Sequence, residues 1–524
     1  MTARLLPLLA LTACAMPPAA GPPRTVAETS EGRRTSRQSD VDAFIQALLP
    51  LPHADRLSQH VFGATHEGRM MQVVVAAEPP IHDLDEVCRS DKLRLLVNAN
   101  IHAGEVEGKE VVQAVLREIA LGGHEDLLKD AVLLFVPIYN VDGNERIDRT
   151  NRVNQNGPEE GVGTRANAQG LDLNRDFIKV EAPETRALIG LMGRTDPHLF
   201  MDLHTTNGSH HGYELTYSPS LSTGIDPTLD AFNRGTLLPQ VRRRMAEAHG
   251  FATFDYGNFT GTEPPEWVTY DHRERFGTNY VGLRNRLSVL SEAYSYLDFP
   301  GRIDVTHAFV LEVLRVAVNH RAEIQQLTAD ADARTIAGDW TLGVDSILVD
   351  AVPGEILVGE VDEVELPGLG TRIIRREVAV PTPMGMRLGF DSAVRLSPPA
   401  AWVLPDPTAE MVQLLEDHGV AFRRLTTPEE HHAAVFMTAA VEREDTLFQG
   451  HYELSLQGMW HESRREVPAG SLWVPADQAL GRIAAQLLEP LSEDSASTWD
   501  RLKGWEEALE GSRTSPVWRI SKRN

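Results

Sequence analysis

Two polar residues, His102 and Glu105, lie three residues apart directly after the apolar run LRLLVN. A second apolar run, HLFMDLH, ends in His204. Two imidazole nitrogens and one carboxylate form the ligand set of a catalytic zinc ion that keeps one position open for water. A His-x-x-Glu pair alone is more typical of a surface turn, so the hypothesis of a metal site depends on the addition of His204.

Glu292 is the candidate general base. It follows a mostly apolar run, whose burial would leave a charged side chain in need of a partner or a chemical task. A carboxylate on another strand end could take the proton from a metal-bound water. The alternative is a glutamate at a strand terminus that bonds an arginine such as Arg284 or Arg286.

The loop over residues 139–177 is rich in Asn, Gly and Arg. A guanidinium group binds a carboxylate through two parallel hydrogen bonds, and a side-chain amide such as that of Asn174 adds a directed one. The loop therefore suits the capture of a free carboxyl terminus, although a long loop held by its own contacts explains most of its arginines equally well. These arginines are Arg146, Arg149, Arg152, Arg165 and Arg175.

Short apolar runs and helix-like stretches alternate through the first part of the chain. The runs cover residues 70–77, 93–100, 131–139, 198–204 and 287–292, and the helix-like stretches cover 105–123, 182–194 and 302–327. Nearly continuous apolar strands are typical of sheets covered on both faces, so we expect an α/β domain with a mixed, largely parallel sheet sandwiched by helices. The metal-ligand candidates then lie in loops beyond the carboxyl ends of strands, where sites on such sheets gather.

The segmentation of the chain predicts four parts. Residues 1–14 resemble an export signal that ends in a lipobox, Leu11 to Cys14, with Cys14 as the site of lipid attachment; the alternative is a plain secretory signal. Residues 15–40, rich in Pro, Ala and Ser, predict a flexible linker. Residues 41–330 form the catalytic domain, and 331–524 a second α+β domain rich in strands.

The overall composition excludes several classes of function. The 524 residues carry a formal net charge of −25, which disfavours binding to nucleic acid or anionic membranes. The chain has two cysteines, so any zinc must be held by histidines and carboxylates. We expect an exported protein, periplasmic or at the cell surface, that contacts the membrane only through a lipid on Cys14.

Four motifs together resemble those of the metallocarboxypeptidases, over about residues 45–325. They are NIHAGEVEG, GLDLNRDF, DLHTT and the segment around Glu292. The resemblance implies a zinc-carboxypeptidase-like fold and one Zn²⁺ per chain, held by His102, Glu105 and His204. It also implies that Glu292 is the general base, and the C-terminal extension resembles an exported bacterial branch of the family.

The same resemblance assigns the substrate-binding residues. Asn174 and Arg175 would hold the terminal carboxylate, and Asp172 would orient His102. Arg165, or else Arg152, would stabilise the oxyanion. Either Tyr270 or Tyr280 would close over the substrate. Many relatives carry an arginine where this sequence has Ala103-Gly104, which leaves the detailed subsites undefined.

We therefore expect a zinc metallocarboxypeptidase that hydrolyses carboxy-terminal peptide bonds with a zinc-activated water. One alternative is a zinc amidohydrolase that acts on acylated amino acids or cell-wall peptides. Another is a catalytically silent lipoprotein that binds peptides. Two adjacent histidine pairs, 210–211 and 431–432, predict exposed side chains outside the site.

Overall fold

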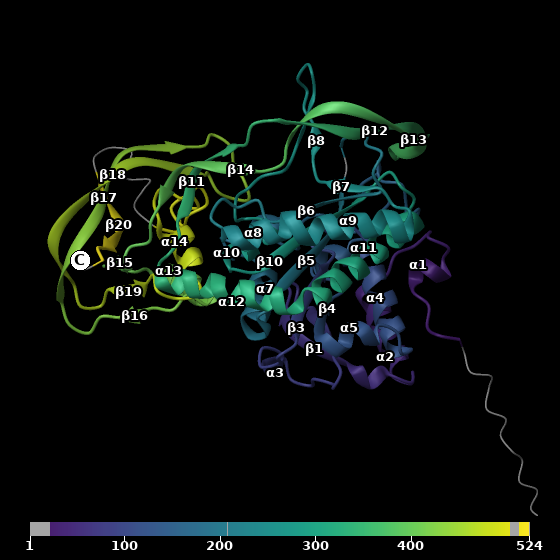
Figure 1. Cartoon of the computed structure of the whole chain (residues 1–524), viewed down its shortest axis with the longest axis horizontal. Coiled ribbons are helices and arrows are strands. Elements are labelled where there is room, and N and C mark those ends of the chain that lie inside the picture. The colour runs from purple at the N-terminus through teal and green to yellow at the C-terminus, as the bar shows by residue number, and fades with distance from the viewer. Residues whose placement is uncertain (1–20, 207, 503–512, 523–524) are drawn as a thin grey trace, which may run out of the picture.

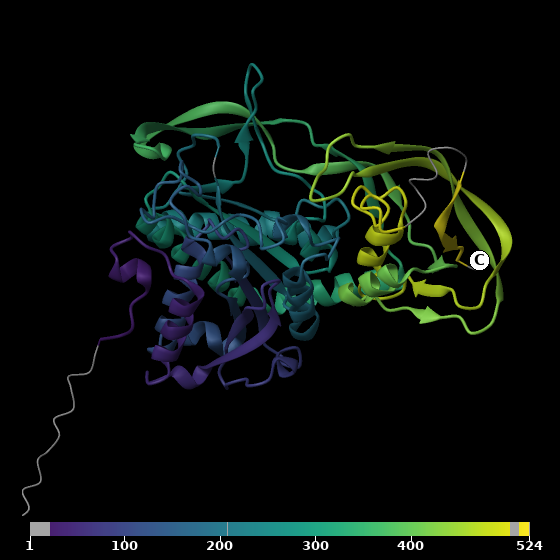
Figure 2. The same cartoon turned by 180° about the vertical axis from the view of Figure 1, so that it is seen from behind.

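The computed structural model describes residues 21–206, 208–502 and 513–522. Cys14 and the predicted export signal lie outside these residues. Among the helices described, none combines the length and the apolar character that a membrane crossing requires. Figures 1 and 2 show two lobes side by side, with the first part of the chain in one and a strand-rich C-terminal region in the other.

An eight-stranded sheet forms the centre of the first lobe, in the order β1-β2-β4-β3-β5-β10-β6-β7. Strands β4, β3, β5 and β10 are parallel neighbours, whereas β1, β2 and β6 join as antiparallel strands. The bounds are β1 Leu57–Ala64, β2 Met70–Ala76, β3 Leu93–Ala99, β4 Ala131–Val136, β5 Leu199–Thr206, β6 Leu215–Ser218, β7 Thr253–Asp255 and β10 Leu287–Tyr294. The predicted mixed, largely parallel sheet is confirmed.

Helices cover both faces of this sheet. Helices α4 (Glu107–Ala120) and α11 (Phe299–Asn319) pack together against one face, and α7 (Pro183–Thr195) and α10 (Gly277–Leu283) cover the other. The central strands are buried along their whole length, as β3, β4 and β5 show, which explains why their sequences lack alternation. The remaining α-helices of this lobe are α1 Val26–Thr29, α2 Gln38–Leu48, α3 Leu84–Val87, α5 Glu125–Asp130, α6 Val141–Glu145, α8 Pro227–Phe232, α9 Leu238–Arg244 and α12 Arg321–Ala337.

The C-terminal region is rich in strands. A six-stranded sheet has the order β16-β19-β15-β20-β17-β18, and β11 pairs with β14 in a separate ribbon. The bounds are β11 Leu342–Leu348, β14 Phe390–Leu396, β15 Ala401–Leu404, β16 Arg423–Arg424, β17 Glu429–Arg443, β18 Leu454–Val467, β19 Leu472–Pro475 and β20 Arg513–Ile520, with helices α13 Ala409–His418 and α14 Gly481–Leu488.

The two lobes are not separated at residue 330. That position falls inside α12, and a four-stranded sheet joins β8 (Asn258–Phe259) and β9 (Glu266–Val268) to the long hairpin of β12 (Val352–Leu366) and β13 (Gly370–Arg387). This hairpin arches along the top of the molecule in Figure 1. Strand β13 pairs with β9 in parallel, Met386 opposite Trp267, so the predicted boundary divides one continuous structure.

The described part of the predicted linker, residues 21–40, is also not a flexible tether. Thr35 and Ser36 are buried, and both donate hydrogen bonds to Glu110 of α4. Glu28 pairs with Arg117 of the same helix. A buried carboxylate such as that of Glu110 needs hydrogen-bond partners, and residues of this segment supply them. Polar contacts of this kind leave no periodic hydrophobic pattern in the sequence.

Candidate active site

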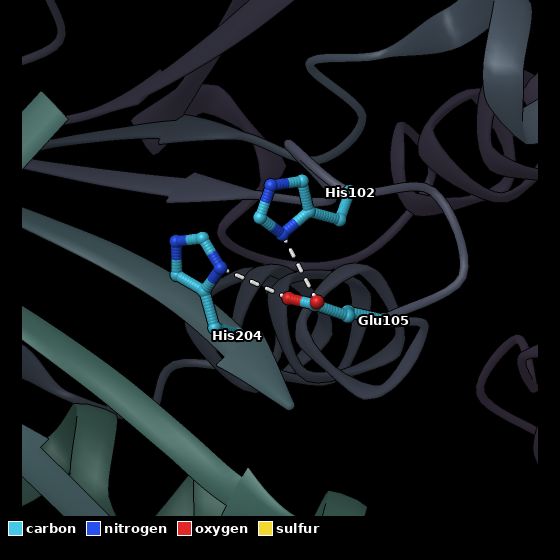
Figure 3. A group of neighbouring side chains, drawn as sticks. All are labelled: His102, Glu105 and His204. Atoms are coloured by element: carbon cyan, nitrogen blue, oxygen red, sulfur yellow. Dashed lines mark hydrogen bonds and ion pairs between the residues drawn. The ribbon is translucent and has the colours of Figure 1, made fainter. Parts of the chain in front are cut away.

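Three candidate ligands converge at the carboxyl ends of β3 and β5. His102 and Glu105 lie in the loop after β3, and His204 lies near the end of β5. Nδ1 of His102 is 3.0 Å from Oε1 of Glu105, and Nδ1 of His204 is 2.9 Å from its Oε2 (Figure 3). One ligand atom from each residue lies within 4.8 Å of the others, so these side chains can hold one metal ion together.

A carboxylate lies behind each histidine. Nε2 of His102 is 3.0 Å from Oδ1 of Asp172, and Nε2 of His204 is 2.9 Å from Oδ2 of Asp202. Asn98 in turn donates to Asp202 over 2.9 Å. Carboxylates in this place fix the ring orientation and tautomer of a metal-binding histidine, which leaves Nδ1 of both rings for the ion.

Asp202 was missed in the sequence analysis. It precedes His204 by two residues, and side chains two apart on a strand point to the same face, so the DLH motif contained the signal. Asp172, which we expected to orient His102, does lie against that ring.

The charge of Glu105 is well compensated. Arg152 donates to its Oε1 over 2.5 Å, and Arg165 lies 3.9 Å from the same atom. Although burial alone would raise it, the charges of His102 and Arg152 hold the pKa of the Glu105 carboxyl well below its usual range. The carboxylate is therefore ionised and available as a ligand.

Glu292 lies directly beside His204. The two residues are register partners in the parallel pair of β10 and β5. Burial raises the pKa of Glu292 to about 8; the charge of His204 opposes this effect, and the charge of Glu105 adds to it. Such a carboxylate is a much stronger base than an exposed one.

The alternative role for Glu292, as a strand-end partner of an arginine, is not what the structure shows. Arg286 pairs with Asp196 and Asp332, and Arg284 donates to the hydroxyl of Tyr280. Both arginines are therefore engaged by other groups.

A cleft of about 160 Å³ is lined by the arginines and the asparagine that were predicted to bind the substrate. Arg175 lies with its guanidinium carbon 3.8 Å from the centre of the Phe276 ring, and Oδ1 of Asn174 accepts a hydrogen bond from the backbone of Gly277 over 2.9 Å. Arg165 donates from Nε to Asp172 over 2.9 Å. The lining includes His102, Glu105, Arg152, Arg165, Asn174, Arg175, His204, Tyr256, Tyr270, Phe276, Thr278, Leu290 and Glu292.

The structure separates the two candidate tyrosines. Tyr270 lines the cleft, with its hydroxyl 2.9 Å from Oγ1 of Thr278. Tyr280 is fully buried elsewhere, with its hydroxyl 2.9 Å from Nδ1 of His418. Tyr256, which was not considered in the sequence analysis, also lines the cleft and accepts a hydrogen bond from Asn258.

One prediction about the other histidines is wrong. His211 is 2% exposed, and its ring centre lies 4.1 Å from that of Tyr294. Burial lowers the pKa of His211 to about 3, so it is a neutral core residue. Adjacent residues on an extended chain point to opposite faces, which is why one of a histidine pair can be buried.

Parts of this chain are similar to known proteins. Residues 43–270 match the family model described as zinc carboxypeptidase, a range that contains His102, Glu105, Asn174, Arg175 and His204 but not Glu292. Carboxypeptidase 2 of Trichophyton equinum is 22% identical over 428 residues, which cover 78% of this chain and 74% of the relative. A solved metallo-carboxypeptidase of Burkholderia cenocepacia is 17% identical with a TM-score of 0.40, covering 54% of this chain and 69% of its own.

Proposed function

We propose that this chain, whose residues 43–270 match the zinc carboxypeptidase family model, is a member of that family and releases the last residue of peptides by hydrolysis of the carboxy-terminal peptide bond. One observation carries the proposal. Within one small cleft, a three-residue ligand set lies beside the partly buried carboxylate of Glu292 and an Asn-Arg pair suited to a free carboxylate. These groups correspond to activation of water, transfer of a proton and recognition of a chain end.

The ligand set fits zinc. His102, Glu105 and His204 offer two nitrogens and one carboxylate, and both imidazoles are oriented by carboxylates on their far side. When bound there, zinc would supply Lewis acidity, which lowers the pKa of water and polarises a carbonyl.

Glu292 would move the proton. Its position beside His204 and its raised pKa suit it to accept a proton from the attacking water and to return that proton to the leaving amine.

Two arginines and one asparagine would position the substrate. We assign the terminal carboxylate to Asn174 and Arg175, which lie together at one side of the cleft. Arg165 would stabilise the negative charge that develops on the scissile carbonyl oxygen, with Arg152 as the second candidate. Both lie near Glu105 and hence near the reacting bond.

We also propose that the enzyme acts outside the cytoplasm, tethered by a lipid on Cys14. This part of the proposal is supported only by the sequence of residues 1–14. Palmitate labelling of the wild-type chain and of Cys14→Ser, expressed in a bacterial host, would test it. Label in both proteins or in neither would refute lipid attachment at Cys14.

The decisive experiment compares wild type with Glu292→Gln, each at full zinc loading. We expect about one zinc per chain in both proteins and release of single residues from the carboxyl end of a peptide library by wild type. The variant should be slower by about 10²- to 10⁴-fold, the usual contribution of a positioned base. Glu312→Gln, which alters a buried carboxylate of α11 outside the cleft, is the matched control.

The outcomes separate the alternatives. If zinc-loaded wild type trims no peptide but hydrolyses N-acylated amino acids or cell-wall peptides, the amidohydrolase function replaces the one proposed. Tight peptide binding without turnover of either substrate class would instead show a silent binding protein. Equal rates for wild type and Glu292→Gln would remove Glu292 from the mechanism.

A further inference from the structure

We propose that the C-terminal region completes the carboxylate-binding side of the cleft, with Gln449 and Asp494 as positioning residues. The inference rests on the proposed function, because it concerns the group that Asn174 and Arg175 would bind. Two segments are involved. One is the turn between β17 and β18, residues 444–453, and the other is the segment after α14, residues 489–502.

The first contact runs from the turn to the metal site. The side-chain oxygen of Gln449 accepts a hydrogen bond from the backbone N–H of Asp172 over 2.8 Å. The carboxylate of Asp172 lies against His102 and binds Arg165. Gln449 therefore fixes the backbone of a residue that orients both a metal ligand and a substrate-facing arginine.

The second contact runs from the later segment to Arg275. Asp494 accepts a hydrogen bond from the backbone N–H of Arg275 over 2.6 Å, and its other oxygen lies 3.0 Å from the guanidinium group. Glu453 of the turn pairs with the same guanidinium over 2.5 Å. Arg275 is 1% exposed, so its charge is compensated by groups of the C-terminal region.

Arg275 immediately precedes the residues that shape the carboxylate site. Phe276 forms the surface on which the guanidinium of Arg175 rests, and the backbone of Gly277 holds the side chain of Asn174. A shift of Arg275 would therefore displace both groups that are assigned to the terminal carboxylate. Because binding to a carboxylate requires alignment of two parallel hydrogen bonds, a small displacement would weaken it strongly.

The segment that follows Arg175 is held in the same way. Glu181 accepts hydrogen bonds from His451 of the turn and from Arg501 of the later segment, over 2.8 and 2.9 Å. The ring of Trp499 lies between Lys179 and Arg275. Both loops that flank the carboxylate site thus rest on the same C-terminal segments.

A simpler interpretation is that these contacts only attach the C-terminal region to the first lobe. The two interpretations differ in what a local change does. An attachment contact alters stability, whereas a positioning contact also alters how well the cleft distinguishes a free carboxylate from an uncharged end.

The test uses two variants that keep the net charge, Gln449→Ala and Arg275→Lys. Each is made in the full-length, zinc-loaded Glu292→Gln protein, so that binding is measured without turnover. The probes are acetyl-Ala-Ala with a free carboxylate and the same peptide as its amide, and their small side chains suit a cleft of about 160 Å³. Arg244→Lys is the control, because it weakens a pair with the buried Glu312 that lies outside the cleft and both C-terminal segments.

We expect the parent protein to prefer the carboxylate by about tenfold or more, the usual value of a charge-assisted pair. The preference should fall by about fivefold in Arg275→Lys and about threefold in Gln449→Ala, while amide affinity changes less than about twofold. In the active background, KM should rise with kcat nearly constant in Arg275→Lys, whereas Gln449→Ala should also lower kcat, because Asp172 orients His102 and Arg165.

Three results are distinguishable. A preference for the carboxylate that is retained in both variants would overturn the inference, whatever happens to the melting temperature. No preference in the parent protein would instead refute the assigned carboxylate site and with it the proposed function. If Arg275→Lys does not fold, Gln449→Ala still tests the inference. The side chain of Gln449 lies in a partly exposed turn, so its removal should not prevent folding.

Discussion

Glu274 is a buried carboxyl whose protonation should make stability depend on pH. It is 5% exposed, and its Oε1 accepts a hydrogen bond from Ser222 over 2.6 Å. Burial raises the pKa of Glu274 from 4.5 to about 7, and the nearby charge of Asp494 acts in the same direction. The folded protein therefore keeps a proton between pH 4.5 and 7 that the unfolded chain has lost.

The sign follows from this difference in bound protons. Below pH 4.5 the carboxyl is protonated in both states and costs nothing, whereas stability declines as the pH rises toward 7. Above pH 7 the cost is complete, and a pKa difference of about 2.5 corresponds to about 3 kcal/mol. Glu274→Gln keeps an acceptor for the Ser222 hydroxyl but cannot ionise, so it should recover that free energy at pH 8 and little of it at pH 5.

Thermal unfolding at pH 5 and pH 8 measures the effect. An unfolding entropy of about 2 cal/mol/K per residue over 524 residues converts 3 kcal/mol into a rise of about 3 °C in melting temperature at pH 8. Glu312→Gln should instead lower the melting temperature at both pH values. Arg244, His249 and Arg315 outweigh burial and lower the pKa of Glu312, so its ionised form stabilises the folded protein. If Glu274→Gln gains no more at pH 8 than at pH 5, the carboxyl is ionised in the folded protein and the argument from burial fails.

Three further predictions concern the metal site, the tyrosines and a second titrating carboxyl. Removal of zinc with a chelator should abolish peptide release, and His204→Ala should bind well under one zinc per chain by elemental analysis; full occupancy would contradict the ligand assignment. Tyr270→Phe should lower kcat/KM on peptides, whereas Tyr280→Phe should leave it unchanged and cost about 1 kcal/mol of stability through the lost hydrogen bond to His418. Despite its burial, two histidine hydrogen bonds lower the pKa of Glu118 from 4.5 to about 2, so its contribution to stability is complete above pH 4.5 and fades toward pH 2. The melting temperature of Glu118→Gln should therefore trail wild type more at pH 7 than at pH 3, and an equal deficit would contradict this.

The candidate ligands could be predicted from the sequence because their signals are local. Apolar runs mark the strands, and His102 and His204 lie at or just beyond the ends of such runs. The order of strands in the sheet is not local, so the pairing of Glu292 with His204 became visible only in the structure. The apolar run before Glu292 had suggested a base there, and the family resemblance favoured that role over an arginine partner.

Other features escaped prediction because they depend on long-range polar contacts. The hydroxyl groups of Thr35 and Ser36 stabilise Glu110 from a segment whose composition is typical of a linker. Tyr256 reaches the cleft from a loop without periodic pattern. The division at residue 330 followed a change in composition, whereas β13 extends the sheet begun by β9.

The contact between Arg275 and Asp494 joins residues that are 219 positions apart in the chain. A ribosome that adds about 5–20 residues per second needs roughly 10–40 seconds to make the intervening stretch. For most of that interval a growing chain already carries both histidines and Glu292. The C-terminal residues that would position Asn174 and Arg175 have not yet been made. The order of synthesis would thus delay a complete carboxylate site until the C-terminal region has been made and has folded against the first lobe.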